Sequence, residues 1–242
     1  MAKWLIAIDD TDDIGTKGTG EIASEIGQLL LAADSDASVS LVTRHQLYVH
    51  ENIPYTSHNS AMCFAYNGGL SLAQIREIAI AHLAQECAAA ADPGLAVVNL
   101  AELTDQGALE LFGLNAKQQV LTKEQAYTLA QQLNVTLSEH GGTGQGVIGA
   151  LAGIGLRLTG NDGRVKGQFQ LGDNIRLSVS DILQQTGLDG VLTTEGQWLQ
   201  AADVVQLAGK TKAVFAKGKF ALLVAQTDGV WHNASKQQLK DY

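Results

Sequence analysis

Four carboxylate side chains lie close together near the start of this chain, in the segment MAKWLIAIDDTDDIGTKGTG. A short apolar run from Trp4 to Ile8 precedes them and predicts a buried strand. The carboxylates at its C-terminal end are Asp9, Asp10, Asp12 and Asp13. Like charges so close together cost stability unless a cation or a hydrogen-bond donor lies beside them. Carboxylate oxygens suit Mg²⁺, which usually takes one or two of them together with water and substrate phosphates.

We therefore predict that Asp9, Asp10 and Asp12 are magnesium ligands and catalytic residues. Among the threonines that accompany them, Thr11 and Thr16 are candidate phosphate contacts, and Thr19 is expected to cap the helix that follows. The alternative interpretation is a solvated acidic turn, although an ordinary turn needs only one Asp or Asn.

A second candidate site is the glycine-rich run over residues 141–149, which comes directly before an apolar helical pattern. The N-terminus of a helix offers unpaired N–H groups and a positive dipole end, and glycines let phosphate oxygens approach the backbone. The candidate nucleotide-binding residues are Gly142, Thr143, Gly144 and Gly146. The run matches neither the Walker nor the Rossmann spacing, and tight packing of a helix on a sheet would also explain its glycines.

A third candidate is the polar loop over residues 50–61, which lies between two predicted strands. Loops held on a rigid scaffold often contact ligands. Arg44, from the strand before the loop, and Thr56, His58 and Asn59, within it, are the candidate substrate contacts.

Length and composition indicate a globular protein. The chain has 242 residues, 45% of them hydrophobic and 17% charged, which is enough for one large domain or two small ones. No apolar run approaches the ~20 residues needed to cross a bilayer, so we expect a cytoplasmic protein without a membrane partner. Cys63 and Cys87 are too few for a Cys₄ zinc site and are expected as free thiols. The net charge of −9 argues against an independent nucleic-acid surface.

Hydrophobic patterns predict an α+β fold in two parts. Strands and helices alternate up to about residue 158, including a strand over 39–49 and a short one at 120–121, which predicts a mixed-sheet α/β catalytic domain over residues 1–160. Short alternating runs separated by Gly-Asn-Asp-Gly and similar turns predict a smaller β-rich part over residues 161–242, whose role the sequence leaves open.

Taken in order, the three segments resemble the archaeal agmatidine synthetases that modify an isoleucine tRNA, in their ATP-dependent kinase-like catalytic domain and the region beside it. The family's I-D-D-T-D is matched by residues 8–12, and Thr19 falls at the position of the threonine that the family phosphorylates. The family's loop N-x-I-P-[YW]-x-T-R-G-N-G-A is matched by residues 52–61, with one residue fewer and Ser57 at the arginine. Its G-[LI]-I-G-A-L-A-A-x-G is matched by residues 146–155.

The resemblance covers roughly residues 4–160 and implies a phosphotransferase or ligase-like enzyme that uses Mg²⁺ and ATP or another nucleoside triphosphate. Thr19 would be the phosphoacceptor or a ligand of metal and phosphate. Nothing after residue 160 resembles the OB-fold and zinc ribbon that hold tRNA in the family, so we expect an acceptor other than tRNA. The acceptor and the oligomeric state stay open.

Two further interpretations remain from the sequence. The pattern Asp10-Thr11-Asp12 after an apolar strand is also typical of phosphohydrolases that form an aspartyl phosphate, in which the first Asp is the nucleophile. The second interpretation is a module that binds a nucleotide and catalyses no reaction. Hydrolysis of phosphate monoesters with no use of ATP would favour the phosphohydrolase, and tight binding of Mg-nucleotide without turnover would favour the binding module.

Overall fold

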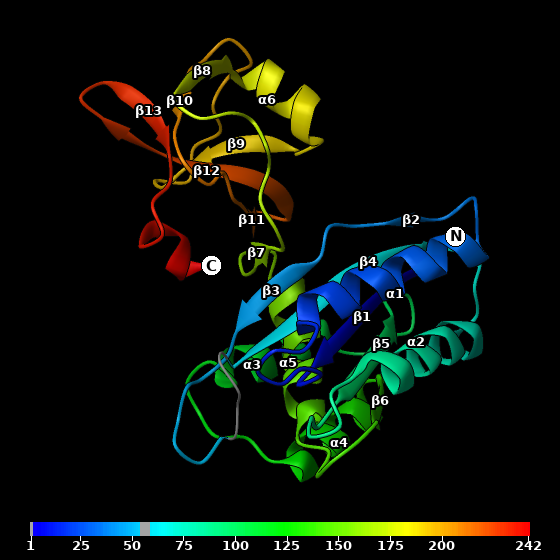
Figure 1. Ribbon diagram of the computed structural model, residues 1–242. Helices are drawn as coiled ribbons and strands as arrows, with labels where there is room; N and C mark the ends of the chain where they lie inside the picture. The colour runs from blue at the N-terminus through cyan, green and yellow to red at the C-terminus, as the bar shows by residue number, and fades with distance from the viewer. Residues whose placement is uncertain (1, 54–58) are drawn as a thin grey trace. The chain divides into compact units, whose positions relative to one another are not determined.

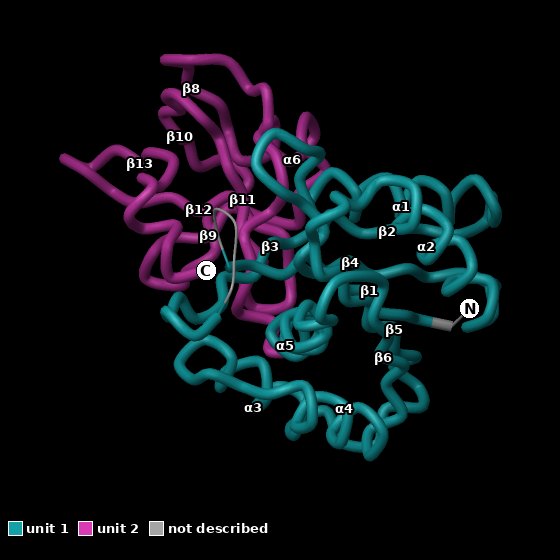
Figure 2. Tube along the Cα trace, turned by 60° about the horizontal axis from the view of Figure 1, so that its bottom comes forward, with its two compact units in different colours: residues 1–158 teal, residues 159–242 magenta. Residues whose placement is uncertain are grey.

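The computed structural model describes residues 2–53 and 59–242, and the chain divides into two compact units, residues 1–158 and residues 159–242 (Figures 1 and 2). Within the described residues there are six α-helices and thirteen strands. The predicted α+β class is therefore confirmed, and so is the β-rich character of the smaller C-terminal part. Each unit has its own hydrophobic cores and is described separately below.

An antiparallel sheet forms the centre of the first unit, with the strand order β6-β5-β1-β4-β3. These strands are β1 (Ala2–Asp9), β3 (Thr43–Gln46), β4 (Ser60–Gly68), β5 (Gly94–Asn99) and β6 (Thr136–Glu139), and the short β2 (Ser38–Val39) pairs with β4. Because neighbouring strands run in opposite directions, β1, β3 and β6 end at the edge of the sheet where β4 and β5 begin. Segments that lie far apart in the sequence therefore meet at this edge.

Helices cover both faces of this sheet. α1 (Thr19–Ala33) and α2 (Leu72–Glu86) pack on one face, while α3 (Gln106–Asn115), α4 (Lys123–Gln132) and α5 (Gly146–Leu158) pack on the other (Figure 1). The alternation along β1 fixes this arrangement, because side chains of a strand point to opposite faces in turn. Trp4, Ile6 and Ile8 enter the core with α1 and α2, and Leu5 and Ala7 enter the other core.

Local details differ from the sequence predictions at three places. The strand predicted over 39–49 is broken into β2 and β3, and residues 120–121 form no strand. The cap predicted at Thr19 is wrong: helix α1 begins at Thr19 with Gly18 as its N-cap, and glycine has no side chain to cap the helix. The Thr19 hydroxyl donates to Asp12. At the start of α2, Ser71 accepts from the Gln74 N–H, and the two residues form a capping box.

The second unit is a mixed sheet with one short α-helix. Its strand order is β7 (Arg164–Val165), β11 (Ala213–Ala216), β12 (Lys219–Thr227), β13 (Val230–Asn233), β10 (Val204–Leu207) and β8 (Ile175–Ser178), and β9 (Gly190–Thr193) pairs with β12. The pairs β9–β12 and β10–β13 are parallel. Helix α6 (Val179–Thr186) is capped by Ser178, and a 3₁₀ turn, Gln238–Asp241, lies near the C-terminus.

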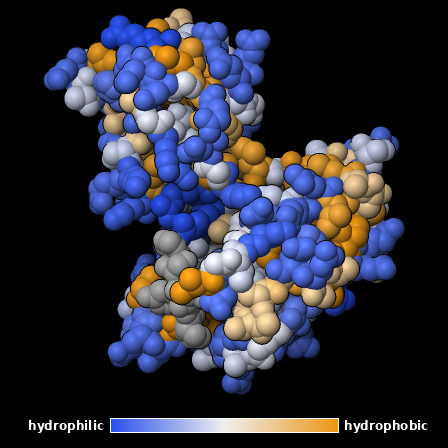
Figure 3. Space-filling model, in the orientation of Figure 1, coloured by the Kyte–Doolittle hydropathy of each residue, from blue (hydrophilic) through white to orange (hydrophobic). Residues whose placement is uncertain are grey.

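Hydrophilic residues predominate on the face of the molecule shown in Figure 3, with smaller hydrophobic patches between them. In the described part of the chain, none of the helices has both the length and the apolar character that a membrane span requires.

Candidate functional site

A cavity of about 260 Å³ lies in the first unit, at the edge of the sheet where β1 ends and β4 begins. Its walls come from the end of β1, the first turn of α1, the segment after α3 and the first turn of α5. Seven of the predicted site residues line it, namely Asp9, Asp10, Asp12, Thr19, Arg44, Asn59 and Gly146. Five others, Thr11, Thr16, Gly142, Thr143 and Gly144, do not line it. Thr56 and His58 lie outside the described residues.

The acidic side of the cavity is a pair of carboxyl groups with raised pKa values. Asp9 is only 8% exposed; burial, with repulsion from Asp10 as a smaller cause, raises the pKa of Asp9 to about 8. Burial also raises the pKa of Asp10 to about 6, with repulsion from Asp92 next in size. A positive charge placed between these groups would restore their ionised forms.

Helix α5 packs directly against Asp9 through a glycine. A Cβ atom at Gly149 would overlap the Asp9 carboxylate, so the bare backbone of the helix leaves the space that this side chain occupies. The contact explains why a glycine stands inside a helix, where it is otherwise unfavourable.

The threonines of the acidic loop have three different roles. The Thr19 hydroxyl donates to Asp12 Oδ1 at 2.8 Å, and both residues line the cavity. The Thr11 side chain is fully buried, and its Oγ1 has no hydrogen-bond partner among the described residues. Thr16 is exposed and closes a local turn, accepting from the Asp13 N–H and donating to the Asp13 carbonyl.

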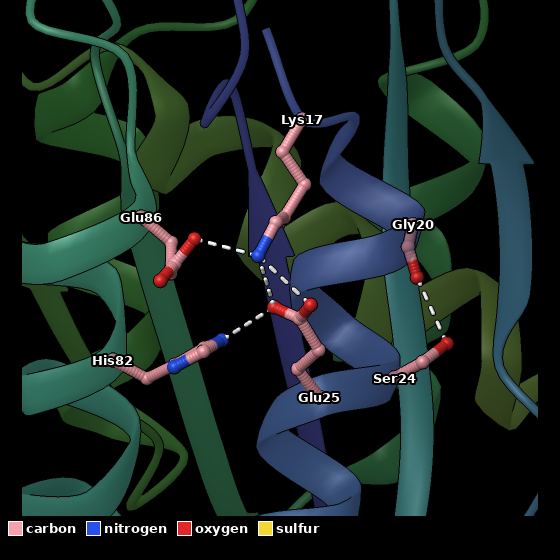
Figure 4. Close-up of polar contacts among 6 residues, drawn as sticks. All are labelled: Lys17, Gly20, Ser24, Glu25, His82 and Glu86. Atoms are coloured by element: carbon pink, nitrogen blue, oxygen red, sulfur yellow. Dashed lines mark hydrogen bonds and ion pairs between the residues drawn. The ribbon is translucent and has the colours of Figure 1, made fainter.

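Lys17 fixes the acidic loop to both helices on its face of the sheet (Figure 4). Its Nζ lies 2.8 Å from a carboxylate oxygen of Glu25 on α1 and 2.6 Å from one of Glu86 on α2. His82 Nε2 lies 2.8 Å from the other Glu25 oxygen. Since Lys17 stands two residues before Thr19, this network holds the segment that places Thr19 at the cavity.

The glycine-rich run is held by a carboxylate of the chain itself. Thr143 donates to Asp92 through its backbone N–H and through its hydroxyl, one bond to each carboxylate oxygen. The Asp92 carbonyl accepts from the Gly146 N–H at 3.1 Å. Lys123 Nζ donates to the Thr143 carbonyl at 2.7 Å and pairs with Glu139 at the same distance. Of the four predicted phosphate contacts in the run, Gly146 is the one at the cavity wall.

Polar residues from β3, from β4 and from the position just before β4 form another wall of the cavity. Arg44 Nε donates to Ser60 Oγ at 2.9 Å, and both residues line the cavity. Asn59 Nδ2 donates to the Tyr48 carbonyl at 2.7 Å, which ties together the two ends of the 48–59 loop.

A buried polar network lies behind this wall. Arg157 on α5 donates to Thr43 Oγ1 at 2.8 Å, and His45 Nε2 lies 2.8 Å from the same hydroxyl. All three residues are buried, and burial lowers the pKa of Arg157 to about 10. The network braces β3, the strand that carries Arg44.

The donor set fits a hard cation only in part. Within residues 2–53 and 59–242, no group of three or more His, Cys, Asp or Glu side chains could hold a metal ion. Asp9 and Asp10 nevertheless form a pair of carboxyl groups with raised pKa values, and a bound cation would lower both pKa values. Two carboxylates with substrate oxygens in the remaining positions are a usual arrangement for Mg²⁺.

Sequence reasoning missed Asp92 and Lys17. Gly94 pairs with Asp9 in the β1–β5 ladder. The pairing brings Asp92 beside the acidic loop. The proximity of Asp92 to the acidic loop could have been predicted only from the order of the strands in the sheet.

Three comparisons with known proteins bear on the fold. No family model and no curated protein matches the chain. The crystal structure of TiaS in complex with its tRNA and ATP has a TM-score of 0.56 at 20% identity, covering 64% of this chain and 36% of that one. The complex of TiaS with its tRNA, AMPCPP and agmatine has a TM-score of 0.55 at 17% identity, covering 75% and 43%. A structure of a tRNA fluorescent labelling enzyme has a TM-score of 0.55 at 22% identity, covering 63% and 36%.

The chain thus spans less than half the length of the solved chains it resembles. TiaS is the agmatidine synthetase of an isoleucine tRNA, so the structural resemblance expected from the three sequence segments is confirmed. At these identities the likeness shows a shared fold: most of this chain is built like part of TiaS.

Proposed function

We propose that the first unit binds ATP, or another nucleoside triphosphate, with Mg²⁺ and catalyses phosphoryl transfer as a transferase or ligase-like enzyme. The observation that carries this proposal is the cavity shared by the Asp9–Asp10 pair, the Thr19 hydroxyl and the first turn of α5. The likeness to TiaS, which was crystallised with ATP and with AMPCPP, supports the same chemistry.

Asp9 and Asp10 are the residues that would hold Mg²⁺. When bound, the ion supplies positive charge that offsets the negative charge of the nucleotide phosphates. The protein contributes a fixed position for both carboxylates: Asp9 is held against Gly149 of α5, and Asp10 follows it at the end of the central strand. Gln145, just before α5, and Gly146, its first residue, line the side of the cavity proposed for the phosphates.

Thr19 and Asp12 have the arrangement of a nucleophile and its base. The Thr19 hydroxyl donates a hydrogen bond to Asp12 Oδ1 at 2.8 Å. At this distance the hydroxyl proton can be transferred to the carboxylate. In the proposed step, Thr19 Oγ bonds to the γ-phosphorus as the bond from phosphorus to the β–γ bridging oxygen breaks. The hydroxyl proton passes to Asp12, and ADP is the leaving group. Arg44 and Asn59 would contact the further acceptor.

The test begins with a thermal-shift titration of the whole chain with ATP, with and without Mg²⁺. A ligand that binds only the folded state raises the melting temperature, and we expect the rise to require both components. Asp9→Asn and Asp12→Asn should abolish phosphoryl transfer. Asp13→Asn is the matched control, because Asp13 lies in the same loop and does not line the cavity.

Mass spectrometry after incubation with Mg-ATP tests the acceptor role of Thr19. A phosphate on Thr19 that is absent from Thr19→Val supports the proposed step. Tight binding with no transfer would instead indicate a binding module. Hydrolysis of phosphate monoesters without use of ATP would favour a phosphohydrolase with Asp10 as nucleophile.

A further inference from the structure

The segment from Asp92 to Gly94 is joined to the glycine-rich run by a set of hydrogen bonds that converge on Asp92. Thr143 donates to both carboxylate oxygens of Asp92. The Asp92 carbonyl accepts from the Gly146 N–H at 3.1 Å, and the Pro93 carbonyl accepts from the His140 N–H at 2.8 Å. Asp92 therefore engages the run with its side chain and with its backbone.

Two glycines of the run, Gly142 and Gly146, are explained by this contact. A Cβ at Gly142 would overlap the Asp92 carboxylate, and Gly142 has a φ of 51°, in the left-handed region that favours glycine. A Cβ at Gly146 would overlap the Asp92 carbonyl. The bare backbone at these two positions accommodates a side chain and a peptide of the chain itself.

The same contact decides which part of the run faces the cavity. The N–H groups of Thr143, Gly144 and Gly146 all have acceptors within the chain, the Gly144 N–H donating to the Gly141 carbonyl at 3.2 Å. Thr143 does not line the cavity, whereas Gln145 and Gly146 do. Fixing Thr143 and Gly146 to Asp92 sets the direction in which α5 begins.

We propose that Asp92 is a positioning residue of the nucleotide site, which acts through Thr143 and Gly146 to hold the first turn of α5 at the cavity wall. This inference rests on the proposed function. In this proposal the Asp92 carboxylate stays bonded to Thr143 when the nucleotide binds, and the nucleotide does not displace it.

The test compares Asp92→Ala and Asp92→Asn in the whole chain. Alanine removes both acceptors. Asparagine keeps one oxygen for the Thr143 N–H and turns its amide N–H toward the Thr143 hydroxyl, which can accept. Asp105→Ala is the matched control, because the Asp105 side chain caps α3 by accepting from the Ala108 N–H and does not line the cavity.

The first readout is amide hydrogen exchange over residues 141–147 in the absence of ligand. We expect faster exchange in Asp92→Ala, nearly wild-type exchange in Asp92→Asn, and no further increase when Thr143→Val is added to Asp92→Ala. Unchanged exchange in Asp92→Ala would overturn the positioning role. This readout does not depend on nucleotide binding.

The second readout is the Kd for Mg-ATP. Loss of a preorganised wall should raise the Kd of Asp92→Ala roughly tenfold, while Asp92→Asn and Asp105→Ala stay close to wild type.

Tighter binding by Asp92→Ala would overturn the inference, because the carboxylate would then be competing with the phosphates. An equal loss in Asp105→Ala would also overturn it, since general destabilisation would explain the result. A wild-type chain that binds no Mg-ATP would refute the proposed function, and the exchange comparison would still decide whether Asp92 holds the run.

Discussion

Replacing Gly149 by alanine should separate the stability of the fold from the function of the cavity. The new Cβ would overlap the Asp9 carboxylate and approach Leu47 Cδ1 to 3.0 Å. The carboxylate is the end of a side chain and can turn away. Turning removes it from the position in which it lines the cavity beside Asp10.

The magnitudes predict a small effect on folding and a large one on binding. Alanine in place of glycine inside a helix stabilises by about 1 kcal/mol, and moving Asp9 off its preferred rotamer costs about 0.5–1.5 kcal/mol. The free energy of unfolding should therefore stay within about 1 kcal/mol of wild type. The Kd for Mg-ATP should rise at least tenfold, which corresponds to about 1.4 kcal/mol.

Gly153→Ala is the matched control in the same helix. There the new Cβ would lie 3.0 Å from the Ala61 Cβ and 3.5 Å from the Ala7 Cβ, on two strands of the sheet. Neither atom can rotate away, so overpacking of about 1–3 kcal/mol should exceed the helical gain. We expect this variant to lose stability and to keep its affinity for Mg-ATP.

Urea unfolding and isothermal titration calorimetry on both variants check this pair of outcomes. Wild-type affinity for Mg-ATP in Gly149→Ala would refute the reasoning, because it would show that nucleotide binding does not need Asp9 where α5 holds it. Equal losses of stability in the two variants would show that the carboxylate cannot turn, and that the overlap is resolved by the backbone.

Further predictions concern buried groups of the first unit. In metal-free buffer the folded chain should hold the Asp9 proton between pH 3.8 and about 8, after the unfolded chain has released it. The free energy of unfolding should therefore fall as pH rises through this window, with Asp9 contributing up to about 1.4 kcal/mol per pH unit. Urea unfolding at several pH values should show that Asp9→Asn removes the slope between about pH 6 and 8, while Asp10, whose pKa is raised to about 6, still contributes at lower pH. Thr43→Val leaves Arg157 without its Thr43 acceptor and should cost about 2–3 kcal/mol, whereas Thr43→Ser should restore most of it in the same assay. Burial raises the pKa of Cys63 to about 12, so this thiol should not react with a disulfide reagent at pH 8 until the chain is unfolded. Lys17→Met should lower the melting temperature at low salt, and the difference from wild type should shrink in molar salt because the ion pairs are partly exposed.

The sequence predicted most of the elements because hydrophobic periodicity records which face each segment buries. The apolar run of β1 was readable from local residues alone. The break between β2 and β3 was not, because residues 40–42 lie outside both strands in a stretch whose alternation looks continuous. There the Ser40 hydroxyl accepts the Ala65 N–H, while the Ser40 N–H still donates to the Ala65 carbonyl. The antiparallel strand order explains why segments that are distant in the sequence meet at one cavity.

Contacts across the sheet were beyond the reach of local patterns. Lys17 bonds to Glu86, 69 residues away in the sequence, and Asp92 bonds to Thr143, 51 residues away. A glycine-rich run before a helix has the same sequence whether a ligand or a side chain of the protein approaches its backbone. The structure shows a side chain at Gly142, which is why the predicted phosphate contacts in this run reduce to Gly146 at the cavity wall.

The position of β1 explains why the acidic cluster lowers the stability of the folded chain. β1 is the middle strand of the sheet, with β4 on one side and β5 on the other. Asp9 is therefore covered by both neighbours and by α5. Burial and the negative charge of Asp10 raise its pKa by more than a hydrogen bond from the Asp10 backbone lowers it. Lys17, the nearest lysine after the cluster, bonds to Glu25 and Glu86 on the helices. A bound cation is the simplest way to recover the free energy that this arrangement costs, so the destabilising position of Asp9 is itself an argument for a ligand.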